Sequence, residues 1–221
     1  MENHCFIINL GDSRAVIGVK SQNPQTKNKK SAYQMSTDHK VDKQEEKKRI
    51  IASGGIVTND NNGPHRVFSK TEDGPGLAVA RTLGDLQGHA IGVSCEPEIT
   101  YKLMDNEDRF IIIGSDGIWD MLNSAEVVGF VFEKLEQISK DKIAESLVNE
   151  ARNRWEVINM YKQKLAVERS LLKDNISSQK NKAQVHIFSI DDITAIICFF
   201  NNIEKQNTKK ENDSNDETYK K

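Results

Sequence analysis

The chain has 221 residues, with 31 basic and 33 acidic side chains and a formal net charge of −2. This near balance argues against a nucleic-acid partner, and no apolar run approaches the roughly 20 residues that cross a bilayer. The N-terminus lacks a secretory signal, and the three cysteines form no disulfide or zinc pattern. We therefore expect one globular domain in a cytoplasmic or nuclear protein, with no membrane partner.

The first half of the chain reads mainly as strands. Residues 5–10 and 15–19 are apolar and β-prone, and the Gly-Asp-Ser-Arg sequence between them predicts a hairpin turn. Residues 33–37 predict a third strand. A helix is predicted to begin at Asp42, with Glu45 as its capping-box partner, and to stop at Gly54.

Two further strands and two helices are predicted next. Residues 99–103 and 110–114 flank an acidic turn and predict an antiparallel pair. Asn123 and Glu126 form a capping box at the start of a helix. Apolar residues at helical spacing then predict one stripe on that helix and another on a further long helix. These residues are Val127, Val131 and Leu135, followed by Ile143, Leu147, Ala151, Trp155 and Ile158.

The C-terminal part contains two apolar runs, residues 185–190 and 193–200, separated by Asp191 and Asp192. The second run does not alternate with polar residues, which predicts a strand covered on both faces. Residues 201–221 are too polar to bury a core and are expected to be a disordered tail. The fold class is therefore α+β, a layered sandwich over residues 1–200.

Four aspartates stand beside apolar runs, where carboxylates are uncommon unless something offsets their burial. They are Asp85, Asp116, Asp120 and Asp191. Mg²⁺ or Mn²⁺ would offset it, because these ions prefer oxygen ligands. Asp116 and Asp120 would share one side of a helical turn at positions i and i+4. The sequence thus indicates a site for a hard divalent cation.

Each aspartate also has an ordinary structural interpretation. Asp-Gly, as at Asp116, is common in turns, Asp120 could cap a helical turn, and Asp191 could close a hairpin loop. His39 and His65 have no partner at a ligand spacing, so we expect packing or surface roles for them.

Five segments in one order carry a family resemblance. They are residues 9–16 (NLGDSRAV), 38–40 (DHK) with the 45–55 helix and its Gly-Gly stop, 76–85 (GLAVARTLGD), 113–120 (IGSDGIWD) and 191–194 (DDIT). Together they make the sequence resemble the metal-dependent PPM, or type 2C, protein phosphatases.

The resemblance implies two packed antiparallel sheets flanked by helices, an α-β-β-α sandwich. It also implies hydrolysis of phosphoserine and phosphothreonine in a phosphoprotein substrate, by a water that Mg²⁺ or Mn²⁺ activates. Asp116 and Asp191 would be ligands of a binuclear centre. Asp85, Asp116 and Asp120 would hold a further, weaker ion.

The family's phosphate-binding Arg, its Glu-Asp pair and its Asp-Gly-His-Gly-Gly block have no counterpart here. We therefore identify no catalytic residue and expect a domain that is incomplete at the N-terminus. A longer product, a partner chain that covers the exposed sheet, or a rearranged remainder would each account for this. Two functions stay open: a phosphatase, and an inactive pseudophosphatase that serves as a binding or scaffold module.

Overall fold

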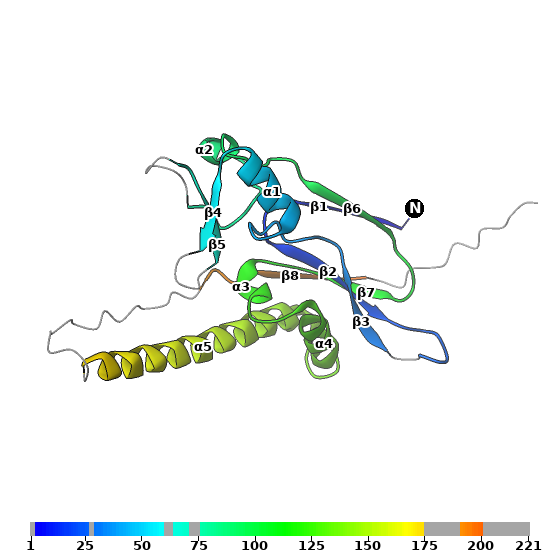
Figure 1. Ribbon diagram of the computed structural model, residues 1–221. Helices are drawn as coiled ribbons and strands as arrows, with labels where there is room; N and C mark the ends of the chain where they lie inside the picture. Colours follow the sequence, from blue (N-terminus) through cyan, green and yellow to red (C-terminus); the bar gives the residue numbers. More distant parts are fainter. Residues whose placement is uncertain (1–2, 27–28, 60–63, 71–75, 175–190, 201–221) are drawn as a thin grey trace, which may run out of the picture.

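The computed structural model describes residues 3–26, 29–59, 64–70, 76–174 and 191–200, with side chains in the long helix described as far as residue 165. The described residues form an α+β fold with antiparallel sheets, as the sequence predicts (Figure 1). The predicted strand at 185–190 and the predicted tail at 201–221 lie outside the described residues.

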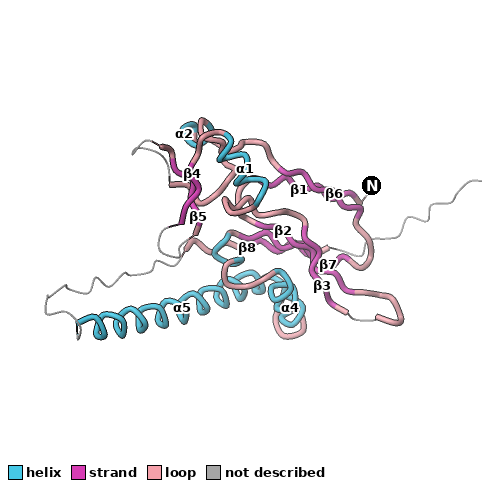
Figure 2. The backbone as a smooth tube through the Cα atoms, in the orientation of Figure 1, coloured by secondary structure: helices cyan, strands magenta, loops and turns pink. Residues whose placement is uncertain are grey.

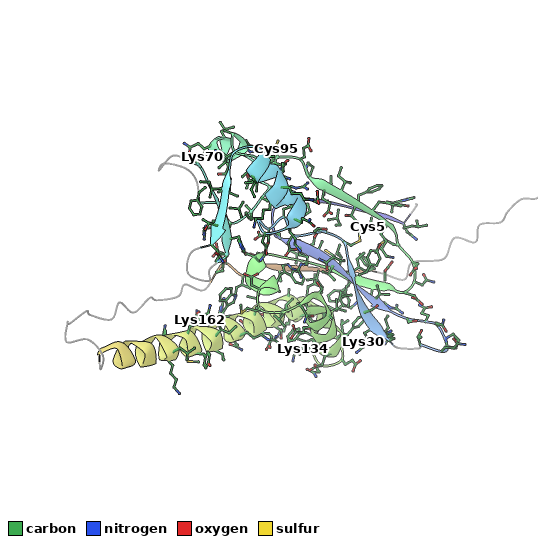
Figure 3. The ribbon with its side chains drawn as sticks, in the orientation of Figure 1. Cys5, Lys30, Lys70, Cys95, Lys134 and Lys162 are labelled. Carbon is green, nitrogen blue, oxygen red and sulfur yellow. The ribbon has the colours of Figure 1, made fainter. Side chains whose placement is uncertain are left out.

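Two sheets form the centre of the molecule. One pairs β1 (His4–Asn9) with β6 (Glu98–Leu103). The other has four strands, in the order β3 (Lys30–Gln34), β2 (Arg14–Lys20), β7 (Asp108–Gly114) and β8 (Ala195–Phe199). The apolar residues that join them include Cys5, labelled in Figure 3, and Ile7 from β1 against Ala15, Ile17 and Ile111.

Helices cover the other face of the four-stranded sheet (Figure 2). They are α4 (Ser124–Lys134) and α5 (Ile143–Asp174), joined through the 3₁₀ helix η1 (Lys140–Lys142). The predicted stripes are confirmed from Val127 to Ala151, because Val127, Val131, Ile143, Leu147 and Ala151 are fully buried against this sheet. The prediction is wrong for Ile158, which is exposed because α5 extends past the core there. The predicted capping box is also confirmed: Asn123 accepts from backbone N–H groups of the first turn of α4, and Glu126 accepts from the Asn123 N–H.

A smaller lobe lies at one end of the sheets (Figure 1). It consists of α1 (Gln44–Ala52), β4 (Ile56–Asn59), β5 (His65–Phe68) and α2 (Leu86–His89). Val41, Ile50 and Val67 form its core. Gly54, with φ +89°, ends α1 as predicted. Asp42 does not cap α1, because the helix begins at Gln44, two residues later than predicted, and its N-cap is Lys43, which makes no side-chain capping bond.

Both predicted hairpins are wrong. β1 does not pair with β2, and β6 does not pair with β7; in each case the turn carries the chain from one sheet to the other. Local patterns identify strands and turns, but the choice of partner depends on contacts distant in sequence. The predicted third strand exists, although β3 begins and ends three residues earlier than predicted.

The prediction that the last strand is covered on both faces is also wrong. On β8, Ile197 packs toward the helices, whereas Ile196 is 53% exposed on the opposite face. Among the described residues, the two-stranded sheet is narrower than the four-stranded one and does not extend over β8. A groove of about 530 Å³ lies between β1 and the end of β8, lined by Asn3, His4, Cys5, Phe6, Met104, Phe199 and Phe200.

The outer face of the β1–β6 pair is apolar and exposed. Phe6 lies opposite Tyr101 and Ile8 lies opposite Ile99, and each of these side chains is exposed.

Among the described residues, no helix combines the length and apolar character needed to span a membrane.

Candidate metal centre

The candidate site begins where β7 ends. Buried residues of β7 lead to Gly114, and the short helix α3 (Asp116–Trp119) starts two residues later. Asp116 is therefore its first residue and is half-buried, while Asp120 follows its last residue and is exposed. The indole N–H of Trp155, on α5, donates to the Gly117 carbonyl over 2.8 Å and fixes α3 in place.

Ser115 holds the Asp191 loop beside α3. Its hydroxyl donates to the Asp192 carbonyl over 2.8 Å and accepts from the Thr194 N–H over 3.0 Å. Its own N–H donates to the Thr194 carbonyl over 3.1 Å. Gly117 allows this close approach, because a Cβ there would lie 2.5 Å from the Asp192 carbonyl oxygen. These contacts bring Asp191, which precedes β8, close to Asp116.

The turn between β1 and β2 supplies a further carboxylate, that of Asp12. Gly11 has φ +108°, a conformation that glycine adopts readily. Its N–H donates to Nδ1 of His39 over 3.1 Å, and its carbonyl accepts from the His39 N–H over 2.9 Å. His39 is buried, so its predicted packing role is confirmed. This pairing fixes Asp12 near Lys40.

The carboxylates of these segments interact electrostatically. Burial, followed by the negative charges of Asp12, Asp191 and Asp120, raises the pKa of Asp116 to about 6. Burial also raises the pKa of Asp12, against the attraction of Lys40. Like charges disfavour ionisation of their neighbours, so the raised values indicate negative charge that is only partly compensated.

Two basic residues lie at the rim of this acidic cluster, which we define as Asp12, Asp116, Asp120 and Asp191. Lys40 Nζ donates to Asp120 Oδ1 over 2.7 Å. Arg14 instead binds Asp38 at two points, and its guanidinium lies 5.0 Å from the centre of the Trp119 ring. Arg14 is thus matched by its own carboxylate, and Lys40 faces the cluster.

Of the four predicted ligands, Asp120 and Asp191 lie near enough to Asp116 for their charges to act on it. Asp85 has different surroundings. It is exposed, has φ +28° and precedes α2. The charges that act most strongly on Asp116 do not include Asp85.

The cluster suits Mg²⁺ or Mn²⁺ in its chemistry, because it offers carboxylate oxygens and unbalanced negative charge. Its present arrangement is looser than a formed site. Across the part of the chain that the structure describes, no three His, Cys, Asp or Glu side chains are grouped closely enough to hold an ion.

Asp12, Lys40 and Ser115 belong to the site, although the sequence patterns do not single them out. The residues around Asp12 predict a hairpin turn, and nothing local shows that this turn joins two sheets. Asp12 lies in the motif at residues 9–16, Lys40 in that at 38–40 and Ser115 in that at 113–120. The family motifs therefore contain all three residues.

Comparison with known proteins gives a consistent result. Residues 1–160 match the family model described as "Protein phosphatase 2C". The chain is 36% identical over 157 residues to "Probable protein phosphatase 2C 52" of Arabidopsis thaliana, covering 70% of this chain and 32% of that protein. It is 38% identical over 152 residues to "Probable protein phosphatase 2C 12" of Oryza sativa subsp. japonica, covering 68% and 37%. The chain thus spans about a third of the length of these relatives.

Two solved structures share the fold. The serine-threonine phosphatase 2C from Toxoplasma gondii superposes with a TM-score of 0.64 at 24% identity, covering 91% of this chain and 56% of that one. A C. elegans sex determining protein superposes with a TM-score of 0.61 at 17% identity, covering 90% of this chain and 37% of that one.

Proposed function

From the premise that this chain belongs to the protein phosphatase 2C family, we propose that it carries part of a Mg²⁺- or Mn²⁺-dependent phosphatase centre acting on phosphoserine and phosphothreonine in proteins. The family is one of protein serine/threonine phosphatases that are generally Mg²⁺- or Mn²⁺-dependent. The observation that supports the proposal most directly is the set of Ser115 hydrogen bonds to Asp192 and Thr194, which hold the Asp191 loop against the helix that begins with Asp116. Burial and the carboxylates of Asp12, Asp191 and Asp120 raise the pKa of Asp116, in agreement with this arrangement.

In this proposal Asp116 and Asp191 would bind one ion, and Asp116 and Asp120 would contribute to a second. We add Asp12 to the ligands of the second ion, because its charge acts on Asp116. Asp85 is not among the charges that act most strongly on Asp116. Such an ion would lower the pKa of a coordinated water and so supply the nucleophile for phosphoester hydrolysis.

The chain's own residues have defined parts in the proposed centre. Ser115 keeps the Asp191 loop against α3, and Gly117 leaves room for it. The Gly11–His39 pairing orients the turn that carries Asp12. The sequence has no counterpart of the family's phosphate-binding Arg or of its Asp-Gly-His-Gly-Gly block, so the phosphate-binding and proton-donating groups that the family uses are not among these residues.

The test is an assay of the 221-residue chain on an aryl phosphate with Mn²⁺, combined with calorimetric Mn²⁺ titration. Asp116→Asn should abolish metal binding and any turnover. Asp141→Asn, an exposed carboxylate in η1, is the matched control and should change neither. Turnover that depends on both Mn²⁺ and Asp116 supports the enzyme.

The second candidate function is that of a binding module. Mn²⁺ binding without turnover, in a folded sample, would favour it over the enzyme. The observation on its side is that the sequence has no counterpart of the family's phosphate-binding Arg or of its Asp-Gly-His-Gly-Gly block, because an ion bound without them lacks the groups that bind phosphate and donate the proton. Absence of Mn²⁺ binding in the folded chain would contradict the proposed centre itself.

A further inference from the structure

Lys40 occupies a specific place relative to the acidic cluster. It follows His39, whose backbone and ring are bonded to Gly11, and it forms a β-bridge with Val79. Its backbone is therefore fixed, while its side chain reaches Asp120 Oδ1 with an Nζ–Oδ1 distance of 2.7 Å. The two side chains are 34% and 40% exposed, so water can reach the pair.

Three carboxylates act on Lys40. Burial alone would lower its pKa, but the hydrogen bond and charge of Asp120, with the charges of Asp12 and Asp38, outweigh burial and raise it. Arg14 already holds Asp38 through bonds of 2.8 and 2.6 Å. The positive charge of Lys40 therefore interacts mainly with Asp12 and Asp120, both members of the cluster.

We propose that the Lys40 ammonium is a built-in counter-ion of the acidic cluster, which a divalent cation must displace from Asp120. Lys40 would then set the affinity of the cluster for Mg²⁺ and Mn²⁺. This inference rests on the proposed metal centre, and it makes Lys40 a positioning residue that acts through Asp120.

The chemistry of lysine suits such exchange. Its ammonium is a compact, strongly hydrated charge on a flexible stem, so it can leave Asp120 and remain solvated. Arg14 contrasts with it, because its planar guanidinium binds Asp38 at two points and lies against Trp119. Arg14 is thus expected to stay in place when a cation enters, and Lys40 is expected to move.

The main variant is Lys40→Met, which keeps the length of the stem and removes the charge. Without the counter-ion the carboxylates repel one another more strongly, so the melting temperature in EDTA should fall. Mn²⁺ should then bind up to about fivefold more tightly, the factor that corresponds to about 1 kcal/mol, the upper value for an ion pair as exposed as this one. Lys40→Arg keeps the charge and should stay close to the wild-type affinity.

The matched control is Lys102→Met. Lys102 pairs with Asp108 over 2.6 Å, but this pair lies where β7 begins, at the opposite end of the strand from the cluster. Its loss should lower the melting temperature and leave Mn²⁺ affinity unchanged. The control therefore separates loss of an ion pair from loss of the proposed counter-ion.

Calorimetric titration of the full chain with Mn²⁺ decides the question. Tighter binding by Lys40→Met, with Lys40→Arg and Lys102→Met near wild type, supports the inference. Equal or weaker binding by a folded Lys40→Met overturns it while leaving the metal centre intact. If neither the wild type nor Lys40→Met binds Mn²⁺, the inference and the proposed centre both fail.

A measurement on the wild type covers the case in which Lys40→Met does not fold. The ¹⁵Nζ signal of Lys40 can be followed by NMR during titration with Mg²⁺. Loss of the hydrogen bond to Asp120 at saturation supports displacement, and an unchanged hydrogen bond in the saturated protein contradicts it.

Discussion

Arg14 and Asp38 form a two-point ion pair, with Nε 2.8 Å from Oδ1 and Nη2 2.6 Å from Oδ2. The Asp38 side chain is only 7% exposed. The pair joins β2 to the segment that carries His39 and Lys40, beside the acidic cluster. It therefore links the fold of the sandwich to the position of the cluster's counter-ion.

The first prediction concerns this pair. Arg14→Met should lower the free energy of unfolding by about 3 kcal/mol, because it leaves a buried carboxylate without its partner. The control Lys48→Met removes the exposed pair with Glu45 and should cost no more than about 0.5 kcal/mol. Urea unfolding measures the free energy of unfolding of both variants. A loss below about 1 kcal/mol for Arg14→Met would contradict the stabilising role of the Arg14–Asp38 pair.

The second prediction concerns Gly117. A Cβ in Gly117→Ala would lie 2.5 Å from the Asp192 carbonyl, so the loop that carries Asp191 must move away from α3. We expect a stability loss of about 1–3 kcal/mol from the overpacking. Mn²⁺ affinity should fall about tenfold, as for other changes that displace a ligand's support.

The matched control for Gly117 is Gly129, in the middle of α4, where a Cβ would meet nothing within 4 Å. Gly129→Ala should raise stability by up to about 1 kcal/mol through helix propensity and leave Mn²⁺ affinity unchanged. Chemical unfolding and calorimetric titration of both variants provide the comparison. Equal Mn²⁺ affinity in the two would argue against the role of Gly117.

The third prediction is a pH dependence caused by His39. Burial, with the charge of Arg81 and that of Arg49, lowers the pKa of His39 against the opposing charges of Glu46 and Glu98. The unfolded chain therefore takes up a proton near pH 6.5, before the folded protein does. His39 adds to stability above that pH, and the contribution is lost as pH falls toward the lower folded pKa.

His39→Asn tests this pH dependence. The free energy difference between wild type and variant should shrink as pH falls from about 7.5 to 5.5, at no more than about 1.4 kcal/mol per pH unit. His65→Asn, on β5, is the control for replacing a histidine away from the Gly11–His39 pairing. Thermal unfolding over this pH range measures it, and parallel curves for wild type and His39→Asn would refute the prediction.

The fourth prediction concerns the exposed face of the β1–β6 pair. Phe6 and Tyr101 stand opposite each other with ring centres 5.0 Å apart, and both are exposed. Exposed apolar surface binds the dye ANS, so the double variant Phe6→Thr, Tyr101→Thr should reduce ANS fluorescence. Tyr33→Thr, an exposed aromatic of β3, should change it much less. A signal that is the same in both variants would place the dye elsewhere.

Some parts of this structure were predictable because their signals are local. The α4 capping box and the α5 stripe at Ile143 and Leu147 depend only on neighbouring residues, and both were predicted correctly. The pairing of β1 with β6 was not, because 88 residues lie between the end of one strand and the start of the other. A turn between two strands looks the same in sequence whether it closes a hairpin or crosses between sheets.

The candidate site divides in the same way. Asp116, Asp120 and Asp191 were found because each stands beside a strand that is apolar in sequence. Asp12 was not found, because it lies near Asp116 only as a result of the pairing of β2 with β7. The role of Lys40 was equally hidden, because its partner Asp120 is 80 residues away.

The position of Asp191 immediately before β8 has a consequence for biosynthesis. Its loop is anchored to Ser115 only when Thr194 and the strand after it are in place at the edge of the sheet. A nascent polypeptide that has reached α5 already holds Asp12, Asp116 and Asp120, but it lacks the last carboxylate. We therefore expect translation products that stop before residue 191 to lack one carboxylate of the cluster and to bind metal with a different affinity from the 221-residue chain.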